Sequence, residues 1–236
     1  VLFRSIFENL SFDIDRGQIV DLVGPSGSGK SSLLTAFALL NPHADGTFTL
    51  DGADSSSFSL QQWRRNVAYL PQKPMLMGDS VADTIRLPWT LAVRRADEAS
   101  APDDHAATGK KTSARRGRFS RLFRSEQSQA KLALPDQLIR NTLDAMGCED
   151  IDLARAPHDL SGGQAARVSL ARTLLTRPAV LLADEVDAGL DDDNADKVAS
   201  IMASAAARGM AIVRIRHRPP DGRATRIVTL SSGRLS

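Results

Sequence analysis

Apolar residues along the chain change their spacing between neighbouring segments, and each spacing predicts a different element. A mostly apolar run at 19–23 has the length of a buried strand, and apolar residues then recur about every 3.6 positions over 33–40, until Asn41-Pro42 ends the pattern. A glycine-rich loop separates the two. Phe12 and Ile14 alternate with acids, which predicts an earlier strand. The chain is therefore expected to enter the loop from a strand and to leave it in a helix.

The rest of the chain continues the alternation of short apolar runs with helical periodicity. Further strands are predicted at 47–50, 67–70, 180–183, 211–215 and 226–230. Helices are predicted at 80–86, 135–147, 162–175 and 194–207. Strands that alternate with helices imply an α/β fold with a mostly parallel sheet flanked by helices.

Length and composition set broad limits. The 236 residues suit one large domain, and 42% apolar with 25% charged residues is typical of a globular protein. Cys148 is the one cysteine, so no internal disulfide can form, which favours a reducing compartment. No apolar run approaches the roughly 18 residues of a membrane-spanning helix, and residues 1–11 lack the features of a signal peptide. We expect a cytoplasmic protein that does not itself cross a membrane.

The net charge of +2 hides one strongly basic segment. Residues 109–124 hold seven basic residues and no acid, which leaves a net charge of −5 for the rest. This run lies within 96–130, where hydrophobic patterning is weak, so the composition predicts a solvated, mobile insert. Three apolar residues leave a basic amphipathic helix on anionic lipid open as an alternative: Phe119, Leu122 and Phe123.

The glycine-rich loop fits the pattern G-x-x-x-x-G-K-[ST] between a strand and a helix, the context in which such a loop binds phosphate. Its glycines let backbone N–H groups surround phosphate oxygens, and the helix start adds the positive end of its dipole. Lys30 supplies a positive charge to the β and γ phosphates, and the Ser31 hydroxyl is a ligand for Mg²⁺. The predicted nucleotide-binding residues are Gly24, Pro25, Ser26, Gly27, Ser28, Gly29, Lys30, Ser31 and Ser32.

A second candidate is the apolar strand at 180–183, which ends in Asp184 and Glu185. Carboxylates at the carboxyl end of a buried strand lie where α/β sheets bind their ligands. Asp184 is a candidate Mg²⁺ ligand, and Glu185 a candidate general base that activates water. Without the phosphate loop, two ordinary solvated acids after a strand would explain this pattern equally well.

The segment Leu160-Ser161-Gly162-Gly163-Gln164, continued by Arg167, resembles the signature sequence of the ATP-binding cassette (ABC) family, in the same order as the two motifs above. The resemblance covers nearly the whole chain. It implies an α/β P-loop NTPase of the ABC type, with an antiparallel β subdomain and a helical subdomain. It also implies a homodimer around two ATP molecules, in which one chain caps the ATP of the other through Ser161, Gly162, Gly163 and Gln164.

Three single residues gain a role through the resemblance. Gln72 matches the loop residue that contacts Mg²⁺ or the attacking water, and His217 matches the histidine that hydrogen-bonds the γ-phosphate. Asp191 matches the loop that crosses the dimer interface. Glu185, His217 and Gln72 are thus the expected catalytic residues, and Ser31, Gln72 and Asp184 the expected Mg²⁺ ligands.

The sequence also departs from the family pattern. His217 lies among Arg214, Arg216 and Arg218, where an acid usually follows the histidine. Asp187 stands where Ser or Thr is common, although this removes no catalytic atom. The aromatic residue that usually stacks on adenine has only Phe3 as a candidate.

Residues 77–89 resemble the matching segment of ATP-binding subunits of a Fet-type iron export system. This implies an ATPase at the cytoplasmic face of the cell membrane, peripheral to it and paired with a separate transmembrane permease, with iron export as the substrate hypothesis. Residues 1–236 are expected to form a single domain, with a helical subdomain at about 73–175 that contains the insert.

The alternative is a non-transport ABC ATPase acting on nucleic acid or ribosomes, for which the basic run could bind phosphates. Only 131 positions separate Lys30 from Ser161, without sustained heptads, and the chain holds one cassette. Both features disfavour that class, so nucleic acid is not the expected partner.

Overall fold

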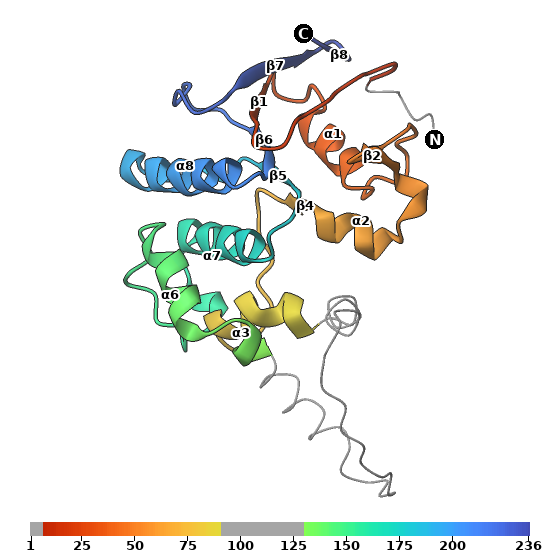
Figure 1. Cartoon of the computed structure of the whole chain (residues 1–236). Helices are drawn as coiled ribbons and strands as arrows, with labels where there is room; N and C mark the ends of the chain where they lie inside the picture. The colour runs from red at the N-terminus through yellow and green to blue at the C-terminus, as the bar shows by residue number, and fades with distance from the viewer. Residues whose placement is uncertain (1–6, 91–129) are drawn as a thin grey trace, which may run out of the picture.

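A six-stranded sheet forms the centre of the molecule in the computed structural model, which describes residues 7–90 and 130–236 (Figure 1). Its strand order is β4-β5-β6-β1-β7-β8, and all neighbours are parallel except β7 and β8. The strands are β1 (Ile19–Val23), β4 (Val67–Leu70), β5 (Val180–Asp184), β6 (Ala211–Ile215), β7 (Arg226–Ser231) and β8 (Arg234–Leu235). Two short strands, β2 (Thr49–Leu50) and β3 (Ala53–Asp54), form a separate antiparallel pair. The prediction of a mostly parallel α/β sheet is confirmed.

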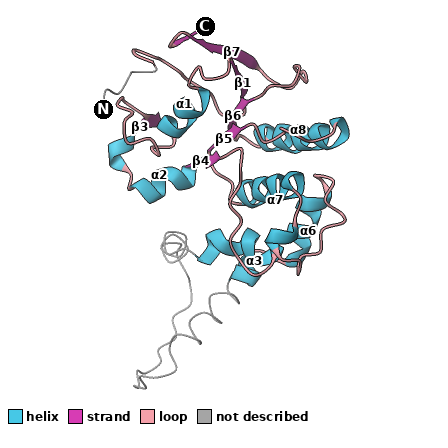
Figure 2. Cartoon of the chain, turned by 180° about the vertical axis from the view of Figure 1, so that it is seen from behind, coloured by secondary structure: helices cyan, strands magenta, loops and turns pink. Residues whose placement is uncertain are grey.

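Helices cover both faces of the sheet (Figures 1 and 2). α1 (Lys30–Phe37) and α2 (Leu60–Asn66) lie on one side, and α7 (Gly162–Leu175) and α8 (Asp192–Ala207) on the other. Successive side chains of a strand point to opposite faces, so Val20 packs in the core beneath α1 while Ile19 packs in the core beneath α7 and α8. Each sheet face is thus buried, as a central parallel sheet requires.

The helical part of the chain lies beyond α7, where α3 (Val81–Arg86) and α6 (Asp136–Asp144) pack against it. Three short 3-10 turns are also present: Ser55–Ser57, Leu87–Thr90 and Pro157–Asp159. Ser80 caps α3 by accepting a hydrogen bond from the Asp83 N–H at 3.1 Å. The predicted helices in this region are confirmed with slightly different ends.

Two predicted elements near the N-terminus differ from the structure. The strand prediction for 12–14 is wrong, since that segment pairs with no strand among the described residues and the Phe12 ring stacks on Phe37 with centroids 5.3 Å apart. Its alternation therefore reflects side-chain packing. α1 also ends at Phe37, earlier than predicted, because Leu39 adopts a positive φ of 53°.

The sequence interpretation assigned no element to 60–66, where the structure has α2. Ser59 and Gln62 form a capping box, in which each side chain accepts a hydrogen bond from the other residue's backbone N–H. Trp63 anchors the helix, because its indole N–H donates to the Phe37 carbonyl at 2.9 Å. The pattern Ser-x-x-Gln was a usable signal for this helix start.

Most of the predicted basic insert lies outside the described residues, so its mobility stays a prediction. The same holds for Phe119, Leu122, Phe123 and the adenine candidate Phe3. Within 7–90 and 130–236, no helix has the length and apolar character needed to cross a membrane.

Candidate active site

The phosphate loop leaves the carboxyl end of β1 and curls around the side chain of Lys30. The Lys30 ammonium donates to the carbonyl oxygens of Gly24 and Pro25, each at 2.9 Å, and the residue is only 6% exposed. Gly24 has a φ of +145°, and a Cβ there would lie 2.1 Å from the Leu230 carbonyl oxygen on β7. Only glycine therefore fits where the loop passes β7.

The start of α1 has donors that no side chain satisfies. Its N-cap, Gly29, is in the left-handed conformation and offers no capping side chain. The Ser28 hydroxyl is buried, and no described residue hydrogen-bonds to it. A ligand with several anionic oxygens would satisfy the free N–H groups, the Ser28 hydroxyl and the Lys30 ammonium together, so these residues fit a phosphate group.

Asp184 is the last residue of β5 and is 4% exposed. Its Oδ2 accepts a hydrogen bond at 2.9 Å from the hydroxyl of Tyr69, on the neighbouring strand β4. Burial and the contact with Asp184 raise the pKa of Tyr69, so the phenol stays protonated and acts as a donor. The sequence interpretation missed Tyr69, because only the strand register brings it beside Asp184.

Glu185 lies between two other predicted catalytic side chains. Its Oε2 accepts a hydrogen bond from Gln72 Nε2 at 2.5 Å, and its Oε1 lies 2.6 Å from His217 Nε2. These residues follow β4, β5 and β6, which are adjacent in the sheet, so the topology explains why they meet. Glu185 has a φ of 52°, a strained conformation of the kind that gathers at functional sites. The structure thus brings together the three residues that were assigned separately.

The predicted Mg²⁺ ligands offer only hard oxygen donors, which are the ligands that Mg²⁺ prefers. Asp184 supplies a carboxylate and Ser31 a hydroxyl at the start of α1. Gln72 uses its amide nitrogen on Glu185, so its amide oxygen is the atom it can offer to a metal. Within the described ranges, no group of three or more His, Cys, Asp or Glu side chains could hold a metal. The donor set fits an ion that takes its remaining ligands from phosphate and water.

The signature residues form the start of α7, at an exposed position. Ser161 Oγ accepts from the Gln164 N–H at 3.2 Å, and Gln164 Oε1 accepts from the Ser161 N–H at 3.0 Å. Gln164 Nε2 also donates to Asp150 at 2.8 Å. Gly162 has open space where a Cβ would lie, whereas a Cβ on Gly163 would crowd Leu190 at 3.0 Å. No hydrogen bond among the described residues joins these residues to the phosphate loop of the same chain.

Asp191 is the N-cap of α8 and accepts from the Asn194 N–H at 2.8 Å. That backbone hydrogen bond holds the pKa of Asp191 below its usual range. The Asn194 side chain in turn accepts from Arg167 on α7 at 2.6 Å. The Asp191 loop is therefore tied to the signature helix.

A phosphate loop after β1, paired acids after β5 and the signature sequence at the start of α7, on one mostly parallel sheet, define an ATP-binding cassette. A family model described as "ABC transporter" matches residues 7–188, and the chain belongs to this family. It is accordingly a domain that binds and hydrolyses ATP, of the type that drives transport.

Curated relatives agree with this assignment. The chain is 32% identical to "Probable iron export ATP-binding protein FetA" of Escherichia coli (strain K12), over 82% of the chain and 69% of that protein. It is 30% identical to "Phosphate import ATP-binding protein PstB 2" of Natronomonas pharaonis, over 98% of the chain and 73% of that protein.

Two solved structures share the fold. An ATP-binding subunit of an ABC transporter has a TM-score of 0.69 and 22% identity, covering 98% of this chain and 81% of that one. A dimeric ATP-binding cassette bound to ADP and Pi has a TM-score of 0.67 and 20% identity, covering 98% and 88%.

Proposed function

We propose that the chain is the ATP-hydrolysing subunit of a transporter whose membrane-spanning part is a separate permease, and that it acts as a peripheral protein at the cytoplasmic face of the cell membrane. The observation that carries the proposal is Glu185, held between Gln72 and His217 on the edge of the sheet where the phosphate loop begins. A carboxylate held in this way is suited to orient water against a bound phosphate.

In the proposed reaction, the loop N–H groups and Lys30 bind the β and γ phosphates of ATP. Glu185 takes a proton from the water whose oxygen attacks the γ-phosphorus, as the bond to ADP breaks. Gln72 and His217 orient Glu185 through their contacts with its two carboxylate oxygens. With ATP bound, the single N–H of a neutral His217 would donate to the γ-phosphate in place of Glu185. Mg²⁺, held by Ser31, Gln72 and Asp184, would neutralise charge on the phosphate oxygens when bound.

The second proposal concerns dimerisation on ATP. Ser161, Gly162, Gly163 and Gln164 would cap the ATP of a second copy, not the chain's own. The proposal is supported by the exposed position of Ser161 and by the absence of hydrogen bonds between these residues and the chain's own phosphate loop, within the described part of the chain. The likeness to a dimeric cassette adds the fold in which such a pairing occurs.

A groove beside the edge strand β4 supports a protein partner. Its walls come from β4, the ends of α1, α2 and α7 and the turn at Leu87–Thr90, and they include Leu40, Arg64, Tyr69, Pro88 and Arg172. Arg64 donates to the Leu39 carbonyl at 2.6 Å and Arg172 to the Met75 carbonyl at 3.4 Å, while neither guanidinium meets a carboxylate of a described residue. A groove with two cations and an apolar rim suits a segment of a permease.

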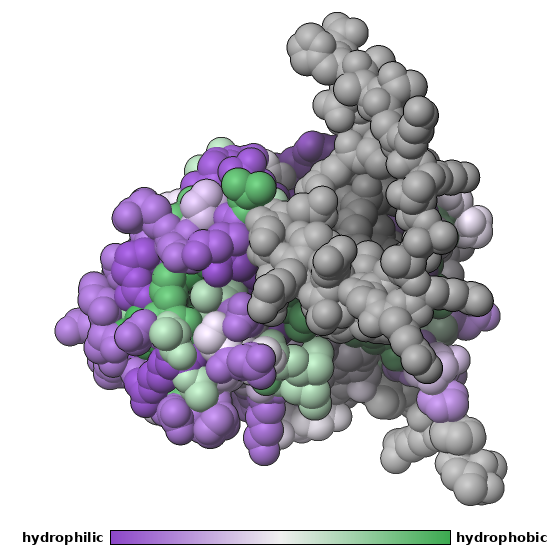
Figure 3. Space-filling model, turned by 90° about the horizontal axis from the view of Figure 1, so that it is seen from below, coloured by the Kyte–Doolittle hydropathy of each residue, from purple (hydrophilic) through white to green (hydrophobic). Residues whose placement is uncertain are grey.

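Apolar side chains also reach the surface nearby. Met75 and Met77 are 73% and 54% exposed, and Leu132 in the helical part is 82% exposed. Seen from the end formed by α3 and α6, apolar side chains are interspersed with polar ones over the part of the surface that Figure 3 colours. Of these, Met77 lies in the segment 77–89 that resembles Fet-type subunits, so the contact surface proposed for a partner combines that residue with Met75 and Leu132 outside the segment.

The substrate would be chosen by the permease. Iron export is the hypothesis that the likeness to FetA favours, while another relative is named for phosphate import, so ATPase sequence alone separates substrates poorly. We also propose that residues 1–236 form one ATP-binding domain, with residues 73–175 as its helical subdomain. The nucleic-acid alternative would need the basic run at 109–124, which lies outside the described residues.

The test is Glu185→Gln, which keeps the shape of the side chain and removes its basicity. We expect ATP binding to persist and turnover to fall by about 10²- to 10⁴-fold, as for loss of a general base. Light scattering should then find a dimer with ATP and a monomer without it. Glu149→Gln, the same change at an exposed acid, is the control. Wild-type turnover in Glu185→Gln would overturn the catalytic assignment, and a monomer in ATP would overturn the dimer.

A further inference from the structure

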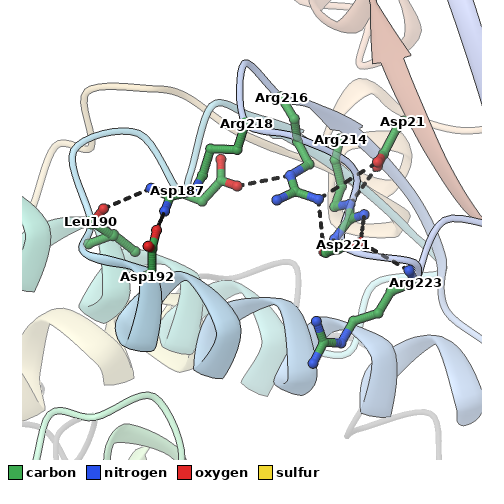
Figure 4. A network of polar contacts seen from close by, with 9 residues as sticks. All are labelled: Asp21, Asp187, Leu190, Asp192, Arg214, Arg216, Arg218, Asp221 and Arg223. Carbon is green, nitrogen blue, oxygen red and sulfur yellow. Dashed lines mark hydrogen bonds and ion pairs between the residues drawn. The ribbon is translucent and has the colours of Figure 1, made fainter.

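A network of polar contacts, built on buried arginines and aspartates, includes Arg216 and Arg218, the two chain neighbours of His217 (Figure 4). The guanidinium of Arg214 is 1% exposed, and the side chains of Asp21, Arg216 and Asp187 are 5%, 7% and 8% exposed. Apolar residues of similar volume often give equal or greater stability than buried ion pairs do. Stability alone therefore does not explain this cluster, and its place beside the active site suggests that it positions residues there.

The arginines around His217 reach partners other than Glu185. Arg214 lies in β6, which ends at Ile215, and Arg216 follows one position beyond it. The side chains of Arg214 and Arg216 leave from the same side, since both reach Asp21 and Asp221. His217 lies between Arg216 and Arg218 and points toward Glu185 at 2.6 Å. The orientation of His217 thus depends on how its two neighbours are held.

Both neighbours are fastened to the loop that joins Glu185 to α8. Arg216 Nε donates to Asp187 Oδ2 at 2.9 Å, in a pair that is nearly inaccessible to water. Arg218 Nη1 donates to the Leu190 carbonyl at 2.8 Å, and its other terminal nitrogen contacts Asp192. The two partners of Arg218, Leu190 and Asp192, are the residues before and after Asp191, the N-cap of α8.

The far end of the His217 segment is anchored as well. Both carboxylate oxygens of Asp221 accept hydrogen bonds from Arg214, at 3.0 and 3.2 Å. Arg214 Nε also donates to Asp21 on β1 at 2.7 Å. Burial acts to raise the pKa of Asp221, but the hydrogen bonds from Arg214 and from the Arg223 N–H, together with the positive charges of Arg214 and Arg216, outweigh it and lower the pKa to about 2. Asp221 is therefore ionised and holds the segment against the sheet. Arg216 shares this anchor, because its Nη1 lies 2.8 Å from Asp221 Oδ2, while its Nε and the guanidinium of Arg218 connect the backbone around His217 to the Asp191 loop.

We propose that Asp187, Arg216 and Arg218 are positioning residues that couple His217 to the loop carrying Asp191. The proposal rests on the proposed role of the Glu185 and His217 site. None of the three has to contact nucleotide. A shift of the Asp191 loop, as when a second chain contacts it, would be passed through the rigid guanidinium contacts to the backbone on both sides of His217. Turnover would then depend on the state of that loop.

The experiment compares Asp187→Asn and Arg218→Gln with wild type. Misplacement of an active-site group by about 1 Å costs up to about 100-fold in rate, so we expect each variant to lower kcat about tenfold. KM for ATP should stay within about twofold, and each change placed in the Glu185→Gln background should leave ATP-dependent dimerisation intact. Asp187→Glu, which keeps the charge, should recover part of the lost kcat.

Asp196→Asn is the matched control. It breaks the 2.8 Å ion pair between Asp196 and Arg223, which lies about one turn into α8 and involves none of Asp187, Arg216 and Arg218. It should leave kcat unchanged. Wild-type kcat in both Asp187→Asn and Arg218→Gln would overturn the proposal, as would a parallel loss of kcat, ATP affinity and melting temperature in Arg218→Gln, whose side chain is partly exposed. Glu185→Gln measured alongside distinguishes this from failure of the proposed site, since turnover in that variant would refute the site itself.

Discussion

The starts of α1 and α7 have similar sequences, rich in glycine and serine, but they satisfy their backbone groups in opposite ways. At α1 the N-cap is Gly29, no side chain caps the helix, and the buried Ser28 hydroxyl has no partner among the described residues. At α7, Ser161 and Gln164 cap each other in a complete capping box, and Gln164 continues to Asp150.

The start of α1 therefore needs a ligand to satisfy its donors, whereas the start of α7 is satisfied without one. A capping side chain stabilises a helix start by about 1 kcal/mol, so the start of α7 is stabilised without a ligand. The start of α1 lacks that term and keeps its donors for an anion. Ser161 still has a donor to offer, because its oxygen accepts the Gln164 N–H while its own O–H proton stays free. Under the proposed function, the phosphate loop would bind ATP first, and the signature of another chain would bind it afterwards.

The largest effect is expected from Lys30→Ala, which removes the cation of the phosphate loop and leaves the signature intact. The ammonium is the one cationic side chain that the phosphate loop itself holds, so we expect the affinity of the isolated chain for ATP to fall by about 100-fold or more. Titration calorimetry measures this directly. Lys131→Ala, which removes an exposed lysine near Asp136, is the control. Affinity within about threefold of wild type would contradict the assignment of the loop.

Ser161→Ala tests the proposed role of the signature at the start of α7. Because the signature is proposed to act on the ATP of a second copy, we expect kcat to fall about tenfold while ATP affinity of the monomer is unchanged. Ser59→Ala is a close control, since it removes a serine from the second capping box of the structure, at α2. If both variants lose the same activity, loss of a cap explains the effect and the role in trans fails.

The same two regions mark what the sequence could predict. The phosphate loop, the paired acids and the signature helix each consist of residues that are close together in the chain. Local sequence patterns were therefore sufficient to predict where these motifs lie in the fold. Tyr69 beside Asp184 and Arg216 beside Asp187 depend on strand register and loop path, which no local pattern encodes. The alternation at Phe12 misled for the same reason, since a period of two reports burial on one side and does not name a pairing strand.

The smallest expected effect concerns the cap itself. Gln164→Ala removes half of the capping box and the contact with Asp150, and Gln62→Ala removes the matching half at α2. Each should lower the free energy of unfolding by about 1 kcal/mol, with the loss at Gln164 the greater by a few tenths because it also frees Asp150. Urea unfolding of the two variants side by side measures the difference. A stability gain in Gln164→Ala would mean that the box at α7 is strained, and the signature would then resemble the uncapped start of α1 more than its geometry implies.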